Sequence, residues 1–186
     1  MFFIPKYAII VYMLKRYEQF LKEFDKHLTE LQRTQSEHIK CVEGCSKCCQ
    51  QGEYPFSRLE MEYLMAGFVN LPKTIKDEIR ENVSWAKGKK EYRCPFLIGD
   101  LCCLYKRRGL VCRTHGLAYL YEGKIRLPDC ANYGLNYSDI YDKETKHISI
   151  NNVIKENLRI DAIFNSPMAK KYNLEKGQIR RLIDWL

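Results

Sequence analysis

The spacing of apolar residues over the first forty positions predicts one long amphipathic helix. The residues that recur every three or four positions are Tyr17, Phe20, Leu21, Phe24, Leu28 and Leu31. Charged residues such as Lys22 and Asp25 lie largely off this stripe. Such a stripe usually packs on the protein's own core, although a partner helix could also use it. We therefore expect a helix from about Tyr7 to His38 that leads directly into the first cysteines.

Two more helices are predicted before the chain becomes irregular. Ser57 and Glu60 have the spacing of a capping box, so a helix should begin at Ser57 and reach about Phe68. Pro72 then suits the first turn of a following helix. The apolar face of that helix would consist of Ile75, Ile79 and Val83.

The remaining segments are less regular. From Tyr92 to Tyr133, glycine and proline repeatedly break short apolar runs, which predicts loops and one or two small hairpins. Asn151 can cap a further helix. The apolar residues expected in that helix are Val153, Ile154, Leu158 and Ile163 or Phe164. The segment from Leu174 to Leu186 has the pattern of a terminal helix.

Together these elements predict a mainly α fold, in which a small helical domain has an irregular, loop-rich core ligated through cysteines to metal. We divide the chain into an N-terminal amphipathic helix (1–40), a cysteine-cluster core (41–135) and a C-terminal helical segment (136–186), all within one domain. A chain of 186 residues with 46% hydrophobic content is long and apolar enough to bury one core.

The chain is basic, with 31 Lys and Arg against 23 Asp and Glu and a formal charge of +8. Such an excess could favour contact with nucleic acid, an acidic protein or an anionic membrane face. If eight cysteines bound two divalent ions, each four-thiolate site would carry a net charge of about −2. About half of the positive excess would then compensate charge inside the protein.

The cysteines are the feature most closely tied to function. Cys41, Cys45, Cys48 and Cys49 fall within nine residues, and Cys94, Cys102, Cys103, Cys112 and Cys130 follow downstream. Short spacings let one backbone turn aim several sulfurs at a single soft ion or cluster, at little cost in chain entropy. Adjacent side chains point in different directions, so one of Cys48 and Cys49 could serve a second site or remain a buried thiol.

The N-terminal sequence and the odd cysteine count favour a cytoplasmic protein with reduced thiols. A secreted disulfide scaffold would want an even number of cysteines and a signal peptide, whereas this chain has nine cysteines. The apolar run from Tyr7 to Leu14 is too short to span a bilayer. Lys15 and Arg16 close it without a small-residue cleavage site, which leaves a cryptic signal peptide as the weaker alternative.

The order of these motifs resembles the YkgJ-like family of cysteine-cluster proteins, which are described as zinc- or iron-chelating domains. The family pattern is a C-x3-C-x2-C-C run, then C-P-F-L with a cysteine a few residues on, then I/L-Y-x-x-R-P-x-x-C-R, and usually one later cysteine. The matching positions are Cys41, Cys45, Cys48, Cys49, Cys94-Pro95-Phe96-Leu97, Cys102, Leu104-Tyr105, Arg108, Cys112-Arg113 and Cys130. The resemblance covers about residues 41–130.

The resemblance implies a set of eight ligands. These metal ligands are Cys41, Cys45, Cys48, Cys49, Cys94, Cys102, Cys112 and Cys130. Cys103 is an extra cysteine, which we leave outside the set. Gly109 stands where the family has proline, and this difference should loosen the turn before Cys112.

A set of cysteine ligands suits zinc or an iron-sulfur cluster such as 4Fe-4S, and argues against magnesium, calcium or a non-haem iron facial triad. His115 alone of the four histidines lies beside a ligand candidate, and a loop imidazole is its more frequent role. Larger proteins with similar clusters, such as flagellin lysine methylases, look like iron-sulfur proteins. The resemblance therefore favours iron-sulfur over zinc.

The predicted function is metal or iron-sulfur cluster binding, in electron transfer, metal handling or support of a methyltransferase-like protein partner. The alternative is a structural zinc module that contacts nucleic acid or protein, in which Lys106 and Arg107 beside Tyr105 would meet phosphates and bases. Arg108 and Arg113 occupy family positions, which favours neutralisation of thiolates and hydrogen bonds to sulfur instead. Nucleic acid is therefore the weaker partner, and Lys106 and Arg107 could simply be solvated.

Whether the protein is an enzyme stays open. The chain has no P-loop, dinucleotide fingerprint, G-x-S-x-G or H-E-x-x-H motif, so only a metal with an open coordination position could support catalysis. Cys41-x3-Cys45-x2-Cys48 also has the spacing with which radical S-adenosylmethionine enzymes hold a 4Fe-4S cluster. Those enzymes place it after the first strand of a barrel of about 200 or more residues. A long predicted helix precedes it here, which makes this interpretation the weakest.

Overall fold

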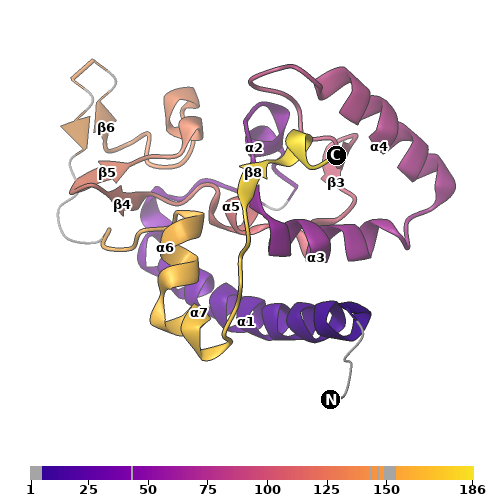
Figure 1. Cartoon of the computed structure of the whole chain (residues 1–186). Helices are drawn as coiled ribbons and strands as arrows, with labels where there is room; N and C mark the ends of the chain where they lie inside the picture. The colour runs from indigo at the N-terminus through magenta and orange to yellow at the C-terminus, as the bar shows by residue number, and fades with distance from the viewer. Residues whose placement is uncertain (1–5, 43, 143, 146, 149–153) are drawn as a thin grey trace.

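The computed structural model describes residues 6–42, 44–142, 144–145, 147–148 and 154–186. About half of the chain is helical and the strands are short, which confirms the prediction of a mainly α fold (Figure 1). No helix in these ranges is both long enough and apolar enough to cross a bilayer.

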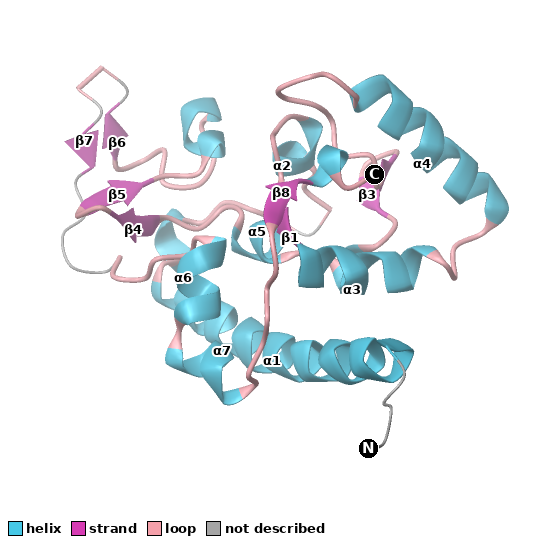
Figure 2. Ribbon diagram, in the orientation of Figure 1, coloured by secondary structure: helices cyan, strands magenta, loops and turns pink. Residues whose placement is uncertain are grey.

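The α-helices are α1 (Lys6–Thr34), α2 (Lys47–Gln50), α3 (Arg58–Phe68), α4 (Lys73–Ala86), α5 (Leu110–Thr114), α6 (Ile160–Asn165) and α7 (Pro167–Lys171). Short 3-10 helices are η1 (Ser36–His38), η2 (Tyr105–Arg107), η3 (Asp129–Tyr133) and η4 (Leu182–Asp184). The strands form antiparallel pairs, namely β1 (Pro55–Ser57) with β8 (Ile179–Arg181), β2 (Leu97–Ile98) with β3 (Leu101–Cys102), β4 (Tyr119–Tyr121) with β5 (Lys124–Arg126), and β6 (Tyr141–Asp142) with β7 (His147–Ile148). The β2–β3 and β4–β5 hairpins confirm the prediction for residues 92–133 (Figure 2).

Helix α1 confirms the predicted amphipathic helix, although the α-helix ends at Thr34 and η1 continues the chain to His38. It lies along α3 and α7, so its apolar stripe packs on the protein's own core (Figure 1). The Tyr17 ring, for example, stacks on Phe164 of α6 and meets Tyr63 of α3 edge-on at 5.3 Å between centroids.

The next two helices also follow the sequence. The capping box is present, since Ser57 Oγ accepts from the Glu60 N–H at 3.3 Å and Glu60 Oε2 accepts from the Ser57 N–H at 2.8 Å. Helix α3 ends at Phe68, as predicted. Helix α4 begins directly after Pro72 and buries Ile79.

The helix expected after Asn151 is wrong over residues 154–159, and Val153 lies outside the described residues. Asn151 itself lies outside the described residues, and residues 154–158 are irregular, so helix α6 begins only at Ile160. The irregular segment runs beside β4, where the Glu156 carbonyl accepts from the Leu120 N–H at 2.8 Å. A backbone partner in another segment thus replaces the hydrogen bonds that a helix would have supplied.

The terminal helix expected from Leu174 to Leu186 is also wrong. Gly177 has a φ of +67°, a conformation outside the helical region, and Ile179–Arg181 form strand β8 against β1. Leu182 and Ile183 are then buried in η4. The apolar spacing allowed a helix, but pairing with a strand distant in sequence decided the outcome.

Two main apolar cores lie on either side of α3. Leu59 and Tyr63 of α3 face the first core, which α1, α6 and α7 complete. Met61 and Leu64 face the second core, which α4 and the C-terminal segment from Leu182 complete. The second core also borders most of the cysteine-bearing loops.

A buried carboxylate joins α3 to α5. Glu60 is 1% exposed, and its Oε1 accepts from the Leu110 N–H at 2.7 Å while its Oε2 accepts from the Ser57 N–H at 2.8 Å. Burial raises the pKa of Glu60, and the hydrogen bonds from Ser57 and Leu110 oppose the rise. The contact fixes the first turn of α5, the helix that carries Cys112.

We expect Glu60→Gln to lower the free energy of unfolding by about 1–3 kcal/mol. An amide has one acceptor oxygen, so its NH2 group would face one of the two backbone donors. Urea unfolding measures the change. Glu81→Gln, an exposed position on α4, is the matched control and should shift stability by less than about 0.5 kcal/mol. Equal losses in the two variants would contradict the structural role of Glu60.

Candidate metal centre

All nine cysteines lie in the described part of the chain, and all are free thiols. The outer group lies outside the two main cores and comprises Cys41, Cys45, Cys48 and Cys130. The inner group borders or enters the second core and comprises Cys49, Cys94, Cys102 and Cys112. Cys103 borders the same core.

The inner group is assembled from three distant segments. The Cys94 N–H donates to the Cys49 carbonyl at 2.9 Å, which joins the residues around α2 to the loop after α4. Cys102 stands on the β2–β3 hairpin and Cys112 on α5. Burial raises the pKa of Cys112 to about 12, and the negative charges of Cys102 and Cys48 contribute further. These thiols are therefore within electrostatic reach of one another.

The outer group surrounds α2 and η3. Helix α2 carries Cys48 and packs on η3, which carries Cys130. Burial is the largest cause of the raised pKa of Cys130, and the charges of Cys41 and Cys48 add to it. The pKa of Cys41 is likewise raised by burial and by the charges of Cys45 and Cys48, against a hydrogen bond from Asn136 that lowers it.

The two groups meet at the adjacent residues Cys48 and Cys49. Their Sγ atoms lie 3.9 Å apart. This contact, followed by burial, raises the pKa of Cys48 far above its ordinary value. Cys49 packs against the second core and Cys48 does not. The charge of Cys48 raises the pKa of Cys102 and Cys112 as well as that of Cys41 and Cys130, so Cys48 lies between the two groups.

The thiols lie in two groups, but within the described residues they do not point at a common metal position. Among the described residues, no three Cys, His, Asp or Glu side chains are placed so that they could hold one metal ion as they stand. The donor chemistry nevertheless fits a soft metal, because each group supplies four thiols. Binding would require side-chain rotation and release of the thiol protons.

Cys103, the cysteine outside the family motif, borders the same core as the inner thiols. Its N–H donates to the Phe96 carbonyl at 3.0 Å across the β2–β3 hairpin. Burial raises its pKa to about 11, with the charge of Cys102 as the next cause. The hairpin fixes its backbone, while its side chain lies within electrostatic reach of Cys94 and Cys102.

Asn136 is a residue of the site that sequence reasoning missed. It is 1% exposed, and its Nδ2 donates to the Gly116 carbonyl at 2.7 Å and to Cys41 Sγ at 3.3 Å, while its Oδ1 accepts from the Lys40 N–H at 2.8 Å. Gly116 has a φ of +86°, and a Cβ there would lie 2.9 Å from Asn136 Nδ2. A lone asparagine outside the cysteine motifs carries no signal in one sequence, so only the fold reveals its role.

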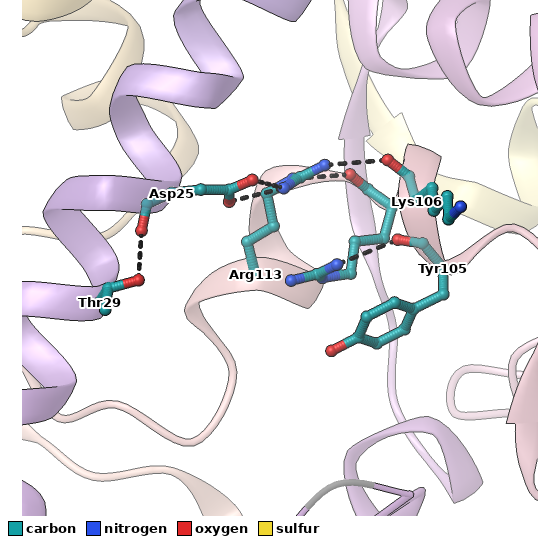
Figure 3. Close-up of polar contacts among 6 residues, drawn as sticks. Asp25, Thr29, Tyr105, Lys106 and Arg113 are labelled. Carbon is teal, nitrogen blue, oxygen red and sulfur yellow. Dashed lines mark hydrogen bonds and ion pairs between the residues drawn. The ribbon is translucent and has the colours of Figure 1, made fainter.

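We expected Arg113 to donate hydrogen bonds to sulfur, but its donors are used elsewhere. Its guanidinium is buried and donates to Asp25 Oδ1 of α1 at 2.6 Å, to the Arg108 carbonyl at 3.1 Å and to the Lys106 carbonyl at 3.3 Å (Figure 3). It thereby ties α1 to the turn that precedes Cys112. Its influence on the thiols is exerted through the position of that turn.

The neighbouring cations have separate roles. Arg108 lies over the Tyr105 ring at 4.0 Å, and its charge opposes the burial that raises the pKa of Cys102, in agreement with a neutralising role. Arg107 is more than a solvated cation, because it donates to the Tyr63 carbonyl at 3.3 Å and lies over the Tyr63 ring. Lys106 has an exposed side chain, as expected.

Gly109 is tightly packed, although we expected its glycine to loosen the turn. A Cβ at this position would lie 2.6 Å from Phe56 Cε1 and 3.0 Å from Glu60 Oε1. Any side chain at this position would therefore press on the buried Glu60 carboxylate, which positions α5. The turn before Cys112 is held by packing rather than by a proline ring.

His115 follows α5 and lines a cavity beside the outer group. Burial lowers the pKa of its imidazole, and the Asp129 carboxylate opposes that shift. The described residues give the ring no hydrogen bond, and no metal-binding group forms around it.

The surroundings of Cys41 and Cys48 do not match a radical S-adenosylmethionine barrel. The motif follows α1 and η1 rather than a strand. The strands that the structure describes form only two-stranded antiparallel sheets, so no α/β barrel is present in these ranges.

Comparison with known proteins agrees with the motif analysis. Residues 40–131 match the model of the CxxCxxCC family, which is described as "Putative zinc- or iron-chelating domain". Neither the curated proteins nor the solved structures gave a match. The matched segment contains all nine cysteines.

We expect Arg113→Ala to lower the free energy of unfolding by about 2 kcal/mol or more, because it removes a buried cation and leaves two carbonyls without their donor. Arg80→Ala is the matched control, since its ion pair with Asp77 is local and exposed and should contribute about 0–1 kcal/mol. Thermal and urea unfolding measure both. A loss at Arg113 no larger than that at Arg80 would refute the role of the Asp25 contact.

Proposed function

The segment 40–131 of this chain belongs to the CxxCxxCC family, and we propose that its eight family-motif thiols hold two metal centres, one in each group. The inner centre would use Cys49, Cys94, Cys102 and Cys112, and the outer centre would use Cys41, Cys45, Cys48 and Cys130. The family supports metal binding in general, with zinc or iron as the metal.

The division of the thiols by their contact with the second core is the observation that carries this proposal. Cys94 is 8% exposed and enters the second core, whereas Cys41 and Cys45 are exposed to solvent. A single ion cannot draw on all eight thiols, because soft divalent metals in proteins take about four. The junction at Cys48 and Cys49 allows two four-thiolate centres to lie side by side.

The two centres would differ in task. An inner centre with four thiolates is closed, and its proposed role is to hold the β2–β3 hairpin and α5 together. Cys41 and Cys45, the two exposed thiols of the outer group, suit exchange with a protein partner: electrons if the group is an iron-sulfur cluster, or the metal itself if it is zinc. Such exchange in a cytoplasmic, reducing setting is our proposal for the biological role, including service to a methyltransferase-like partner.

A structural zinc module that binds nucleic acid is the second candidate, and the contacts weigh against it. Arg113 is hydrogen-bonded to Asp25, and Arg107 is hydrogen-bonded to the Tyr63 carbonyl. The Arg108 guanidinium lies over the Tyr105 ring. Cations that are already paired within the protein gain less from phosphate contacts. Only weak, salt-sensitive and sequence-independent association with DNA or RNA is expected.

Anaerobic purification followed by elemental analysis and visible absorption distinguishes the metals. Iron with acid-labile sulfide and broad visible absorption would identify iron-sulfur, whereas zinc without colour would identify a zinc protein. We expect about two four-thiolate centres per chain if both groups are filled. A protein that takes up neither iron nor zinc would refute the proposed function.

We expect Cys45→Ser and Cys112→Ser each to remove metal from one centre and leave metal in the other. Cys112→Ser should also lower thermal stability more strongly, because the inner centre is coupled to the second core. Cys103→Ser is the matched control and should keep full metal content. Metal loss in the Cys103 variant would show that the inner ligand set is displaced by one residue.

We expect Asn136→Ala to weaken the outer centre by about 10- to 100-fold in metal affinity, because Asn136 holds Cys41 in place and donates to its sulfur. Metal competition with a chromophoric chelator measures the affinity. Asn165→Ala, an exposed position on α6, serves as the control. Unchanged metal affinity in the Asn136 variant would remove this residue from the site.

A further inference from the structure

A cavity of about 360 Å³ lies beside the outer group and is not used by either proposed centre. It is open to solvent and is lined by the end of α5, strand β4, the loop before η3, the start of α6 and strand β8. This volume is at the small end of the range for ligand pockets. Leu117, Leu158 and Ile160 form buried apolar parts of its wall.

The charged groups of the cavity are of both signs. Arg159 and Asp129 line it, as do Asp161 and His115. Asp161 is neutralised by Lys176. In contrast, Arg159 has no carboxylate partner among the described residues, and its guanidinium lies over the Tyr121 ring at 4.1 Å. Asp129 forms no ion pair within the described ranges, and the charged group it acts on in the cavity is the His115 imidazole, whose pKa it raises against the effect of burial.

We propose that this cavity binds a small zwitterion with an apolar body, the chemistry of an apolar α-amino acid. The carboxylate of the ligand would pair with Arg159, its ammonium group with Asp129, and its side chain would cover Leu117, Leu158 and Ile160. An Arg fork matches the planar carboxylate in geometry, and the apolar wall supplies the burial. A dianion such as phosphate fits less well, because Asp129 would repel it.

The cavity adjoins the outer group, but the proposed recognition of the ligand does not depend on the outer thiols. Asp129 directly precedes Cys130 in η3, and Gly116, which lines the cavity, has Cys41 Sγ only 3.3 Å from where its Cβ would be. The wall of the cavity is thus shared with two outer thiols. The recognition chemistry itself resides in Arg159 and Asp129, so it goes beyond metal binding and can be tested separately.

Three related probes separate the charge requirements. Isothermal titration calorimetry of the full chain, in the metal state in which it is purified, would compare L-leucine, 4-methylpentanoate and 3-methylbutylamine. The second probe lacks the ammonium group and the third lacks the carboxylate. We expect L-leucine to bind at least about tenfold more tightly than either analogue, since each charge-assisted hydrogen bond contributes about that factor.

Two variants should act on opposite ends of the ligand. Arg159→Ala should weaken L-leucine and 4-methylpentanoate by about 10- to 100-fold and leave 3-methylbutylamine unchanged. Asp129→Asn should weaken L-leucine and 3-methylbutylamine instead. Arg126→Ala is the matched control, because Arg126 lies beside the same Tyr121 ring at 5.9 Å but does not line the cavity. Metal content is measured in each variant, so that damage to the outer group is recognised.

The proposal is overturned if 4-methylpentanoate binds as tightly as L-leucine, if none of the three probes binds, or if Arg126→Ala weakens L-leucine as much as Arg159→Ala. Binding of inorganic phosphate in place of L-leucine, abolished by Arg159→Ala, would also overturn it and assign the cavity to phosphate. Cys45→Ser separates the two proposals. If this variant loses its outer metal and still binds L-leucine, the binding supports the cavity proposal. The metal proposal is tested by the metal content alone.

Discussion

The hydrogen bond from the Leu110 N–H to the buried carboxylate of Glu60 is the constraint on which the arrangement of the thiols depends. Through it the capped start of α3, which separates the two cores, sets the start of α5 and so the position of Cys112. The approach is close enough that Gly109 cannot gain a side chain without moving Phe56 or Glu60. A charge placed inside the protein is costly unless its acceptors are satisfied, and here two backbone donors satisfy them. The same carboxylate therefore serves as a helix cap and as the anchor of a distant loop.

The thiols sit in two different physical environments. The inner thiols are packed against apolar side chains, where thiolate charge is disfavoured until a cation compensates it. Cys41 of the outer group is held by a polar network, in which Asn136 joins Cys41, Lys40 and Gly116 through one buried amide. Metal uptake at the inner group would mainly consolidate the fold, while uptake at the outer group would alter a surface that a partner can reach. Arg113 links the turn before Cys112 to α1 through Asp25.

The parts of the fold that local chemistry decides were predictable from the sequence. Helix α1, the Ser57–Glu60 capping box and the start of α4 after Pro72 depend on neighbours within one or two turns, and they are confirmed. The C-terminal helices were wrong because β8 pairs with β1 and the segment before α6 runs beside β4, contacts that no local spacing encodes. At the site, the family spacing identified the cysteines as metal-chelating candidates and the family match agrees, while the individual ligand assignments stay predictions. The contact of Asn136 with Cys41, the ion pair of Asp25 with Arg113 and the hydrogen bond of Glu60 with Leu110 escaped notice, because each acts across a long stretch of chain.

The pairing of β1 with β8 has a consequence for how the protein is made. Strand β8 and the buried Leu182 and Ile183 close the second core against Tyr54 and Phe56, so that core lacks a wall until the last part of the chain has been synthesised. At about 5–20 residues per second, Cys49 emerges of the order of ten seconds before its cover. During that interval the inner thiols are open to oxidation and to whichever soft metal is at hand. The identity of the inner metal would then be decided by supply during synthesis, and afterwards be trapped by the closing of the core.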